Sequence, residues 1–531
     1  MLHLLFSAAA AKTVSTTLGR ISGKTVTAYD NSTIDAYFGI PFAVPPLEHL
    51  RFAKPVPHEP WTTTRDATKH GNCCVQFGFA TISSDSPDVL GHEDCLVLDV
   101  YAPSPTGQNR PVLVWFYGGS FLEGCINLYD MKNLAARTGA IVVAVNYRLS
   151  ALGYLGLPEQ VEDGSTNAGL HDMRLGLKFV HDNAHAFGGD PDRITIFGQS
   201  AGGAAVLFQL VMPMETPPLF HSAILQSPGG RKGWVQDLKS ADNDALSKAE
   251  MVNHSIALAS TRGCGSTPSP QRLACMRNLS VSALMAEPFG RFAPAADGKL
   301  IADDPLKLVA AGKWSKMPVI LGGTSCESCA GQGMFIKPGP PRTLSKSTYL
   351  TMLNETFGPS RFSKPVDVRP KEVEQMYEGY AAKRGYWRAL TRIASDDGHA
   401  CNAFLLTSAF TNSSNAPVYR YEFRAAGGHP GQDYPGAVHA SELSYLFRTQ
   451  SPYEPSKLNP EQDQLALFMQ DRWGELASKA KVGPMWPPCT KGVHPCDHVM
   501  IFDTPHATIE TELTADDGSA AQHCARWAEF M

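Results

Sequence analysis

The sequence predicts an α/β protein built on a large, mostly parallel sheet with helices on both of its faces. Short apolar runs rich in β-branched residues recur along the chain, and continuous runs of this length are typical of strands buried on both faces. Helical patterns lie between several of these runs; within residues 168–187, apolar residues recur at helical spacing from Leu170 to Val180. Strand–helix–strand order favours parallel pairing, with helices covering the sheet. The expected strands are residues 112–117, 141–146, 194–197, 222–226, 318–321, 418–423 and 499–502.

The composition is that of a large globular protein. Hydrophobic residues make up 43% of the 531 residues and charged residues 18%, a balance too apolar for a disordered chain. The formal net charge is −5 and no block of lysine or arginine stands out, which argues against a nucleic-acid-binding surface. No apolar stretch reaches the ~18 to 20 residues that span a bilayer, so we expect a soluble protein without a transmembrane segment.

The first residues and five short motifs bear on the compartment. Residues 1–11 hold a short apolar run followed by small residues, which resembles a signal peptide that lacks the usual basic residues. An arbitrary chain start is the alternative. Five Asn-x-Ser/Thr sequons favour a secreted glycoprotein, although several would arise by chance in a chain of this length. Their asparagines are Asn31, Asn253, Asn278, Asn354 and Asn412.

The most informative segment runs from Ile194 to Gly203. A short β run leads into Gly-Gln-Ser-Ala-Gly at residues 198–202, and a small, apolar, helix-like stretch follows. This is the Gly-x-Ser-x-Gly pattern of a nucleophile elbow in its strand–turn–helix context, with Ser200 as the nucleophile. Side chains at the two glycine positions would crowd such a turn, and the helix that follows places its positive end near a developing negative charge. A glycine-rich turn without chemistry is the alternative, which the flanking strand and helix disfavour.

A second glycine-rich turn follows the expected strand at 112–117. Acyl-transfer chemistry requires backbone N–H donors aimed at the oxyanion, and paired glycines let the backbone approach a substrate oxygen closely. We therefore expect the N–H groups of Gly118, Gly119 and Ala201 to form an oxyanion hole. Taken alone, an ordinary turn at a strand end would be the better interpretation; the elbow motif reverses that preference.

A nucleophilic serine needs a base, and the base needs an orienting acid. In hydrolases with this elbow the chain order is serine, acid, histidine. Glu327 follows a buried-type run that ends at Gly323, so its carboxylate can reach a site at the carboxyl edge of the sheet; a solvated loop glutamate is the alternative. Pattern alone does not choose among nine downstream histidines, which are His221, His254, His399, His429, His439, His494, His498, His506 and His523.

Further motifs lie along nearly the whole chain. They are FGIPFAVPP at 38–46, LRFAKP at 50–55, EDCLVLDV at 93–100, NYR at 146–148, NAGLHD at 167–172 and FGGDP at 187–191. Together with the elbow, these motifs resemble those of the type-B carboxylesterase/lipase family, which includes fungal lipases, carboxylesterases and the cholinesterases. The resemblance implies the α/β-hydrolase fold, hydrolysis of carboxylic esters, and one domain over residues 12–531 whose extra length forms loops above Ser200.

The resemblance also implies the remaining site residues. Glu327 corresponds to the family's acid, although the family usually has glycine where Ser328 stands. His439, in Gly-Ala-Val-His-Ala-Ser-Glu-Leu, corresponds to the catalytic base. Ser227 corresponds to a residue that supports the acid and base by hydrogen bonding, and Glu442 to a buried carboxylate behind the site. A purely structural role is the alternative for both.

Twelve cysteines suit the disulfide framework of a secreted hydrolase. Cys326-Glu-Ser-Cys329 has the spacing of redox motifs, but a disulfide, or two bridges to other cysteines, that fixes the loop is the preferred interpretation. No Cys/His cluster has zinc-like spacing, so we expect no metal site and no cofactor. The resemblance implies pairing of Cys74 (or its neighbour Cys73) with Cys95, of Cys264 with Cys275, of Cys401 with Cys524 and of Cys489 with Cys496, and leaves Cys73, Cys125, Cys326 and Cys329 unassigned.

Two departures from the cholinesterase pattern bear on the substrate. Cholinesterases have glutamate before the nucleophile, whereas this chain has Gln199, and residues 74–95 contain no tryptophan to hold a quaternary ammonium. We therefore expect a general carboxylesterase or lipase that acts on a small-molecule or lipid ester. A secreted esterase specialised for an acetyl, feruloyl or natural-product ester is the alternative. Trp234 and Phe292 match positions that often line the acyl pocket, with core packing as the rival interpretation.

A non-catalytic binding protein on the same scaffold, as in neuroligin-like relatives, is the rival from another class. The intact serine, acid, histidine and oxyanion glycines disfavour it. The sequence makes no prediction of the oligomeric state.

Overall fold

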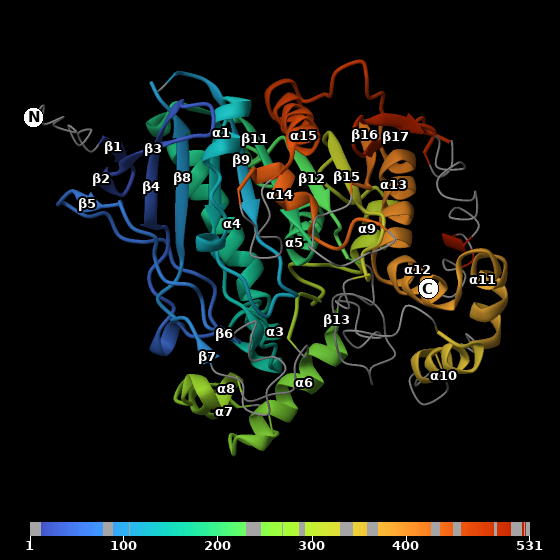
Figure 1. Ribbon diagram of the computed structural model, residues 1–531. Coiled ribbons are helices and arrows are strands. Elements are labelled where there is room, and N and C mark those ends of the chain that lie inside the picture. The colour runs from blue at the N-terminus through green and yellow to red at the C-terminus, as the bar shows by residue number, and fades with distance from the viewer. Residues whose placement is uncertain are drawn as a thin grey trace, which may run out of the picture.

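A large, mostly parallel sheet forms the centre of the molecule (Figure 1). The structure is a computed structural model that describes residues 12–77, 89–105, 107–229, 246–267, 269–285, 292–329, 344–357, 370–425, 436–449, 458–492, 496–510, 523–524 and 526. The strands of the sheet are β3 (Lys24–Thr27), β4 (Thr33–Pro41), β8 (Val97–Pro103), β9 (Arg110–Phe116), β10 (Ile141–Val145), β11 (Gly189–Gln199), β12 (Ser222–Gln226), β15 (Val319–Thr324), β16 (Val418–Phe423), β17 (Val499–Phe502) and β18 (Thr508–Glu510).

The seven apolar runs expected as strands form the parallel part of this sheet. The strand order is β18-β17-β16-β15-β12-β11-β9-β10-β8-β4-β3. Every pairing from β17 to β10 in this order is parallel, and these are the seven runs that the sequence singles out. The pairings that involve β18, β8, β4 and β3 are antiparallel. The predicted fold class, α/β with a large, mostly parallel sheet, is confirmed.

Two antiparallel strands escaped the sequence analysis because a buried aspartate interrupts each apolar run. β4 contains Asp35, which is 3% exposed, and β8 contains Asp99, which is 1% exposed. Asp99 is accommodated because its carboxylate accepts the N–H of Gly39 at 2.8 Å and lies 2.5 Å from His70 Nδ1. A buried charge that is paired and hydrogen-bonded in this way does not prevent strand formation.

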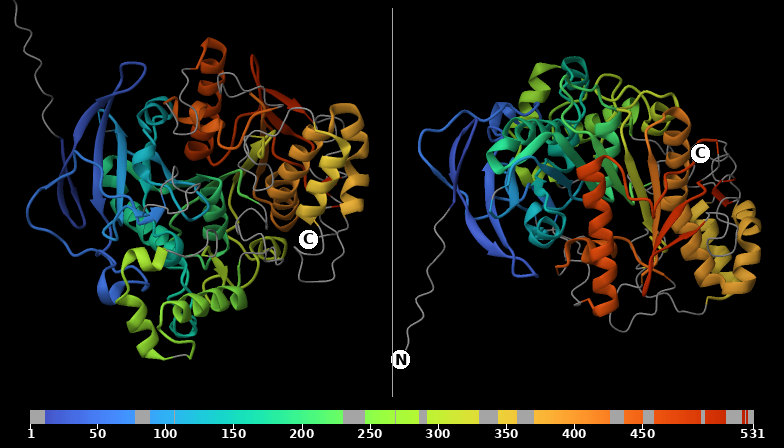
Figure 2. Two further views of the ribbon diagram at one scale, coloured as in Figure 1. Left: turned by 60° about the horizontal axis from the view of Figure 1, so that its bottom comes forward. Right: turned by 90° about the horizontal axis from the view of Figure 1, so that it is seen from above.

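Helices cover both faces of the sheet, with α1, α14 and α15 on one side and α4, α5, α9 and α13 on the other (Figure 2). α5 lies directly against the sheet, and all eleven of its residues are buried, as expected for a helix that is apolar all round. The bounds on these faces are α1 (Lys132–Thr138), α4 (Ala168–Asn183), α5 (Ala201–Val211), α9 (Pro305–Ala310), α13 (Cys401–Ser413), α14 (Glu442–Phe447) and α15 (Pro460–Lys479).

Further helices lie at the periphery. Three of them, α10, α11 and α12, have a small apolar core of their own that includes Tyr349, Val373 and Leu390, and they lie at one end of the molecule (Figure 1). The peripheral helices are α2 (Ser150–Tyr154), α3 (Pro158–Asp163), α6 (Lys248–Thr261), α7 (Pro270–Arg277), α8 (Val281–Met285), α10 (Lys346–Phe357), α11 (Pro370–Arg384) and α12 (Tyr386–Ser395). Short strands outside the main sheet are β1 (Thr13–Thr16), β2 (Gly19–Ser22), β5 (Arg65–Asp66), β6 (Gln76–Phe77), β7 (Val89–Leu90), β13 (Leu246–Ser247) and β14 (Ala295–Ala296).

All twelve cysteines form disulfides. The structure contains the four pairings implied by the family resemblance, and Cys74 rather than Cys73 bonds Cys95. The four cysteines without assigned partners form Cys73–Cys125 and Cys326–Cys329. The second of these bridges spans only three positions and encloses Glu327.

The sequon asparagines lie at the surface. Asn31, Asn253, Asn278, Asn354 and Asn412 are all exposed. Residues 1–11, where the sequence suggests a signal peptide, lie outside the described part of the chain. Within the described part, no helix is both long and apolar enough to cross a bilayer.

Candidate active site

Ser200 occupies a strained turn between β11 and α5. Its φ of 58° and ψ of −126° fall outside the regions that side chains other than glycine ordinarily adopt, a conformation that costs about 1–3 kcal/mol and is typical of functional sites. The turn is held on both sides: the Ser200 N–H donates to the carbonyl of Gln226 at 2.9 Å, and the Ala204 N–H donates to the carbonyl of Ser200 at 2.9 Å. The surrounding contacts thus fix the elbow predicted from the sequence.

The elbow glycines are required by close backbone contacts. A Cβ atom at Gly198 would lie 2.4 Å from the carbonyl oxygen of Gly202. A Cβ atom at Gly202 would lie 2.0 Å from the carbonyl oxygen of Phe116, at the end of β9. Neither distance is tolerated by any side chain, so the packing of β9 against the elbow excludes every residue except glycine.

Of the two predicted oxyanion glycines, Gly118 lies directly beside Ser200. A Cβ atom at Gly118 would lie 3.0 Å from the Cβ of Ser200, so the backbone passes directly against the serine. Gly119 follows with a φ of 115°, a conformation that favours glycine. Ala201 is the first residue of α5, whose first-turn N–H groups have no acceptor within the helix. The backbones of Gly118 and Ala201 therefore both lie against Ser200.

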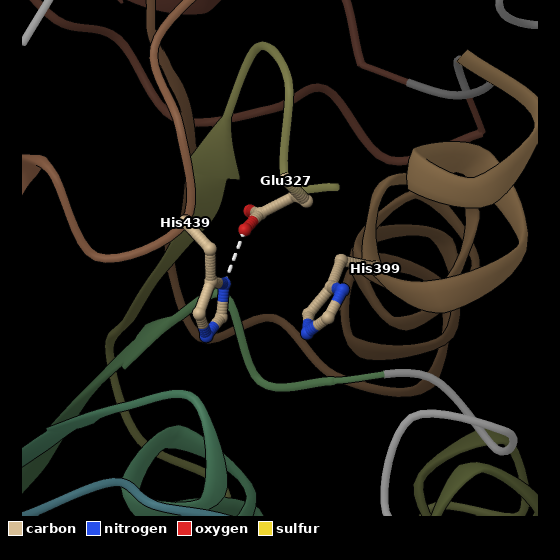
Figure 3. Close-up of side chains that lie close together, drawn as sticks. All are labelled: Glu327, His399 and His439. Carbon is tan, nitrogen blue, oxygen red and sulfur yellow. Dashed lines mark hydrogen bonds and ion pairs between the residues drawn. The ribbon is translucent and has the colours of Figure 1, made fainter. Parts of the chain in front are cut away.

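Glu327 and His439 form a close, buried pair on the other side of the site (Figure 3). Glu327 lies in the loop after β15 and is 2% exposed; its Oε2 is 2.5 Å from Nδ1 of His439. Its Oε1 accepts hydrogen bonds from Ser227 Oγ at 2.7 Å and from the Thr324 N–H at 2.8 Å. Both carboxylate oxygens are thus satisfied, which fixes the orientation of the acid towards the histidine.

This pairing controls the protonation of both groups. Burial alone would raise the pKa of Glu327, but the positive charge of His439 and its hydrogen bond, together with that of Ser227, hold the pKa well below its usual value. Burial alone would lower the pKa of His439, but the charge of Glu327 and their hydrogen bond raise it. A charged carboxylate that raises the basicity of an imidazole is the arrangement that general-base catalysis requires.

The second nitrogen of His439 faces the elbow. The Gln199 side-chain amide lies 3.1 Å from Nε2 of His439, and because Nδ1–H donates to Glu327, the amide donates and Nε2 accepts. Nε2 is therefore directed at Gln199, the residue before Ser200, and its lone pair accepts the hydrogen bond from the amide. The sequence analysis identified Gln199 only as a departure from the cholinesterase pattern and missed its contact with the histidine.

Glu442 lies beneath the site and is fully buried. Its Oε1 accepts a hydrogen bond from the Gln226 side-chain amide at 3.3 Å, and Gln226 in turn accepts one from the indole of Trp473 at 3.2 Å. Burial raises the pKa of Glu442 to about 7, and the nearby charge of Glu327 adds to this. The backbone carbonyl of Gln226 also accepts the Ser200 N–H, so hydrogen bonds through Gln226 connect Glu442 with the elbow.

The two tentative pocket residues have different outcomes. Trp234 lies outside the described part of the chain. Phe292 is 4% exposed and packs within the main apolar core, in keeping with the rival interpretation of core packing.

Two further features lie on the acid–histidine side: a disulfide that the sequence analysis gave as one of two preferred arrangements, and a histidine contact that it missed. The Cys326–Cys329 disulfide packs against Val438, next to His439, and the Cys326 N–H donates to the Ala437 carbonyl at 2.9 Å. The imidazole of His399 lies with its ring centre 4.8 Å from that of His439 (Figure 3). His399 was one of nine indistinguishable histidines, and only tertiary structure brings it to the site.

The described residues include one group whose chemistry could suit a metal ion. Glu327, His399 and His439 each offer one ligand atom, and these atoms lie within 4.8 Å of one another. The three residues are separated by 72 and 40 positions (399 − 327 and 439 − 399), so no sequence spacing could have indicated the cluster.

Comparisons with known proteins agree with this geometry. The family model described as "Carboxylesterase family" matches residues 10–530. A cholinesterase of Mus musculus is 32% identical over 82% of this chain and 73% of its own length. A para-nitrobenzyl esterase of Bacillus subtilis (strain 168) is 30% identical over 95% of this chain and 96% of its own length, and an acetylcholinesterase of Bungarus fasciatus is 29% identical over 98% and 86%.

The match to the family model spans nearly the whole chain, and the relatives cover most of it at about one-third identity. The sheet has the mostly parallel arrangement of an α/β-hydrolase, and the serine elbow lies at its carboxyl edge. The chain belongs to the carboxylesterase family and is a carboxylic ester hydrolase.

Proposed function

We propose that Ser200 is the nucleophile of this hydrolase, His439 its general base and acid, and Glu327 the orienting carboxylate. The observation that carries the proposal is the 2.5 Å contact between Glu327 and His439, whose other nitrogen faces the strained turn that carries Ser200. The arrangement supports the roles of a serine–histidine–acid triad: the acid fixes the tautomer, and the Nε2 lone pair is directed towards the elbow that carries Ser200.

The proposed reaction is a two-step acyl transfer. Ser200 Oγ attacks the ester carbonyl while Nε2 of His439 removes its proton, and the N–H groups of Gly118, Gly119 and Ala201 stabilise the oxyanion. His439 then protonates the departing alcohol, and water attacks the acyl-enzyme in the same way to release the acid. Each oxyanion donor is worth about 3 kcal/mol of barrier. The hydrogen bond from the Gln199 amide to Nε2 must break before the Ser200 hydroxyl can donate to Nε2. In the free enzyme the amide therefore occupies the acceptor that the serine hydroxyl uses during the reaction.

The proposed substrates are uncharged carboxylic esters with a small or medium acyl group, the range of a general carboxylesterase. Gln199 supports this because it places a neutral amide, rather than a carboxylate, beside Ser200, so this position supplies no negative charge to attract a cationic alcohol. Residues 74–95 offer no tryptophan for a cation–π contact.

A secretory route is also part of the proposal. Six disulfides and five exposed sequon asparagines support it, because disulfides persist in oxidising compartments and sequons are modified there. Expression in a eukaryotic secretory host should give a protein in the medium whose mass falls on treatment with an N-glycosidase. A protein retained in the cell at unchanged mass would contradict this.

The Ser200→Ala variant tests the catalytic proposal. Hydrolysis of p-nitrophenyl esters should fall by at least about 10⁴-fold, because the nucleophile is lost while the oxyanion donors remain. A fluorophosphonate probe should label the wild-type protein at Ser200 and leave the variant unlabelled. The circular dichroism spectrum and melting temperature should stay those of the wild type. Near-wild-type turnover in a folded Ser200→Ala protein would overturn the assignment.

The substrate class is tested with a chain-length series of p-nitrophenyl esters alongside an emulsified triglyceride and a choline ester. The proposal expects the highest kcat/KM for short and medium acyl groups in solution. A preference for the emulsion or for the choline ester would contradict it.

A further inference from the structure

We propose that Glu327, His399 and His439 form a binding site for a divalent transition-metal ion such as Zn²⁺, and that the bound ion reversibly inhibits the enzyme. One ligand atom from each residue lies within 4.8 Å of the other two. Figure 3 shows the two imidazole rings side by side, with the Glu327 carboxylate beside both. Binding depends on this cluster alone, whereas inhibition also rests on the proposed roles of His439 and Glu327.

The donor set suits a zinc-type ion. Two imidazoles and one carboxylate are an established ligand combination for Zn²⁺, with a fourth position left for water. In a tetrahedral site with bonds of about 2.0–2.1 Å, ligand atoms lie about 3.4 Å apart, so these atoms need to close by about 1.4 Å at most. Rotation of the His399 ring towards the Glu327–His439 pair supplies such a movement. Mg²⁺ and Ca²⁺ prefer sites made of oxygen ligands, so this site should discriminate against them.

His399 supplies the third ligand of the proposed metal site, beside the Glu327–His439 pair. It belongs to the π-helical turn Asp396–Ala400 between α12 and α13, and its Nδ1 is buried without a hydrogen-bond partner among the described residues. Among the described residues, no hydrogen bond or ion pair joins His399 to the nearby Asp396, whose Oδ2 accepts hydrogen bonds from Tyr377 and Arg392, each at 2.8 Å. An imidazole that is close to the active-site histidine and not fixed by another group is available to coordinate.

Coordination at either nitrogen of His439 would stop the proposed reaction. An ion on Nε2 occupies the lone pair that accepts the serine proton. An ion on Nδ1 displaces the proton that now bonds Glu327 and breaks the 2.5 Å contact. An ion on the Glu327 carboxylate removes the charge that orients the histidine. The inhibition is reversible because no covalent bond of the protein changes.

The test compares the wild-type protein with His399→Asn and His399→Phe, by calorimetric titration with ZnCl₂ and by inhibition of p-nitrophenyl ester hydrolysis. At a free Zn²⁺ concentration about ten times the dissociation constant, wild-type activity should fall about tenfold and return after EDTA is added. Both variants should bind Zn²⁺ at least about tenfold more weakly than the wild type. Replacing a residue that only hydrogen-bonds to a metal ligand already weakens metal binding by about this factor, so the loss of a ligand should weaken it at least as much. For each protein, the rate at each Zn²⁺ concentration is divided by the rate of the same protein without Zn²⁺, and the inhibition constant is taken from this ratio. MgCl₂ and CaCl₂ should have no effect.

His49→Gln is the matched control, because His49 is an exposed histidine in the 3₁₀ turn Glu48–Leu50 and does not belong to the ligand cluster. It should bind Zn²⁺ and be inhibited as the wild type is. Equal inhibition of the wild type and both His399 variants, or no heat of binding in the wild type, would overturn the proposal. The titration measures binding without turnover. A protein that binds Zn²⁺ through His399 but fails to hydrolyse esters would therefore contradict the catalytic proposal and leave the metal site standing.

Discussion

The two sides of the active site are built in different ways. On the nucleophile side, Ser200 and the glycines around it are fixed by backbone contacts between two adjacent strands, at distances where no side chain fits. On the acid–histidine side, Glu327 and His439 are 112 residues apart and are joined by a side-chain hydrogen bond, and the disulfide that closes the Glu327 loop packs against Val438 beside the histidine. The nucleophile side therefore depends on the sheet, whereas the acid–histidine side depends on loops that follow it.

This difference predicts how each side tolerates change. Replacing an elbow glycine must disrupt β9 and β11 themselves, so the fold suffers along with the activity. On the acid–histidine side, single hydrogen bonds can be removed while the sheet stays intact. For substitutions on this side, the loss of activity should be larger the more directly the replaced group contacts the Glu327–His439 pair.

Glu327→Gln should cause the largest loss on the acid–histidine side. The amide oxygen can still accept from Ser227 and Thr324, but the NH₂ group then faces Nδ1 of His439 and selects the wrong tautomer. We expect kcat to fall about 10⁴-fold in steady-state assays, with the melting temperature little changed. A fall of less than tenfold would show that the 2.5 Å contact is not part of catalysis.

The same variant should shift the pH profile of its residual activity. Burial lowers the pKa of His439, and the charge of Glu327 outweighs this effect and raises it. Without that charge the pKa of His439 falls, so the base stays deprotonated to lower pH. The acid limb of kcat/KM should therefore move to lower pH than in the wild type. A limb that moves to higher pH would contradict the charge interaction.

Removal of the disulfide around the acid, in the double variant Cys326→Ala/Cys329→Ala, should have the next largest effect. The bridge packs on Val438, and its loss should let Glu327 and His439 drift apart. A misplacement of about 1 Å can cost about 10²-fold in rate, so we expect kcat to fall about 10- to 100-fold. The matched control is Cys489→Ala/Cys496→Ala, whose bridge packs against Val499 and Ile501, and it should keep its kcat. Equal losses in both double variants would indicate a general effect on stability.

The two sides of the site also differ in how well the sequence predicted them. The elbow and the glycine turn are contiguous in sequence, and their strand and helix flanks are apolar, so pattern alone located Ser200, Gly118 and Gly119. Glu327 was a reasonable candidate because it follows a buried strand. His439 was indistinguishable from eight other histidines until the family resemblance identified it, because no local pattern encodes a contact across 112 residues.

A Cys326–Cys329 disulfide was one of two arrangements that the sequence favoured for the acid loop, but the contacts of Gln199 and His399 were not predicted, for the same reason. Each depends on how loops from different strands meet at the sheet edge, which periodicity and spacing do not specify. The antiparallel strands β4 and β8 were missed for another reason: paired, buried aspartates interrupt their apolar patterns.

Ser227→Ala should have a smaller effect than loss of the disulfide. It removes one of the two hydrogen bonds to Oε1 of Glu327 and leaves the bond from the Thr324 N–H in place. A hydrogen bond to a charged group is worth about 1.5–3 kcal/mol, and the remaining donor should limit the loss of kcat to about tenfold. Ser227→Thr keeps a hydroxyl and is the matched control. Equal activity of both variants and the wild type would show that this bond does not position the acid.

Glu442→Gln should have the smallest effect on activity, about threefold or less, because the amide can keep a hydrogen bond to Gln226 and lies behind the reacting groups.

The effect of Glu442→Gln on stability should instead depend on pH. Burial raises the pKa of Glu442 to about 7 in the folded protein, from about 4.3 in an unfolded chain. Between these values the folded state binds the extra proton, so wild-type stability falls as pH rises through this window. The Gln variant carries no such group, so its advantage over the wild type should grow by on the order of 3 kcal/mol from pH 4.5 to pH 7.5. Urea unfolding of both proteins at the two pH values measures this difference, and parallel pH dependences would show that Glu442 is not held neutral by its burial.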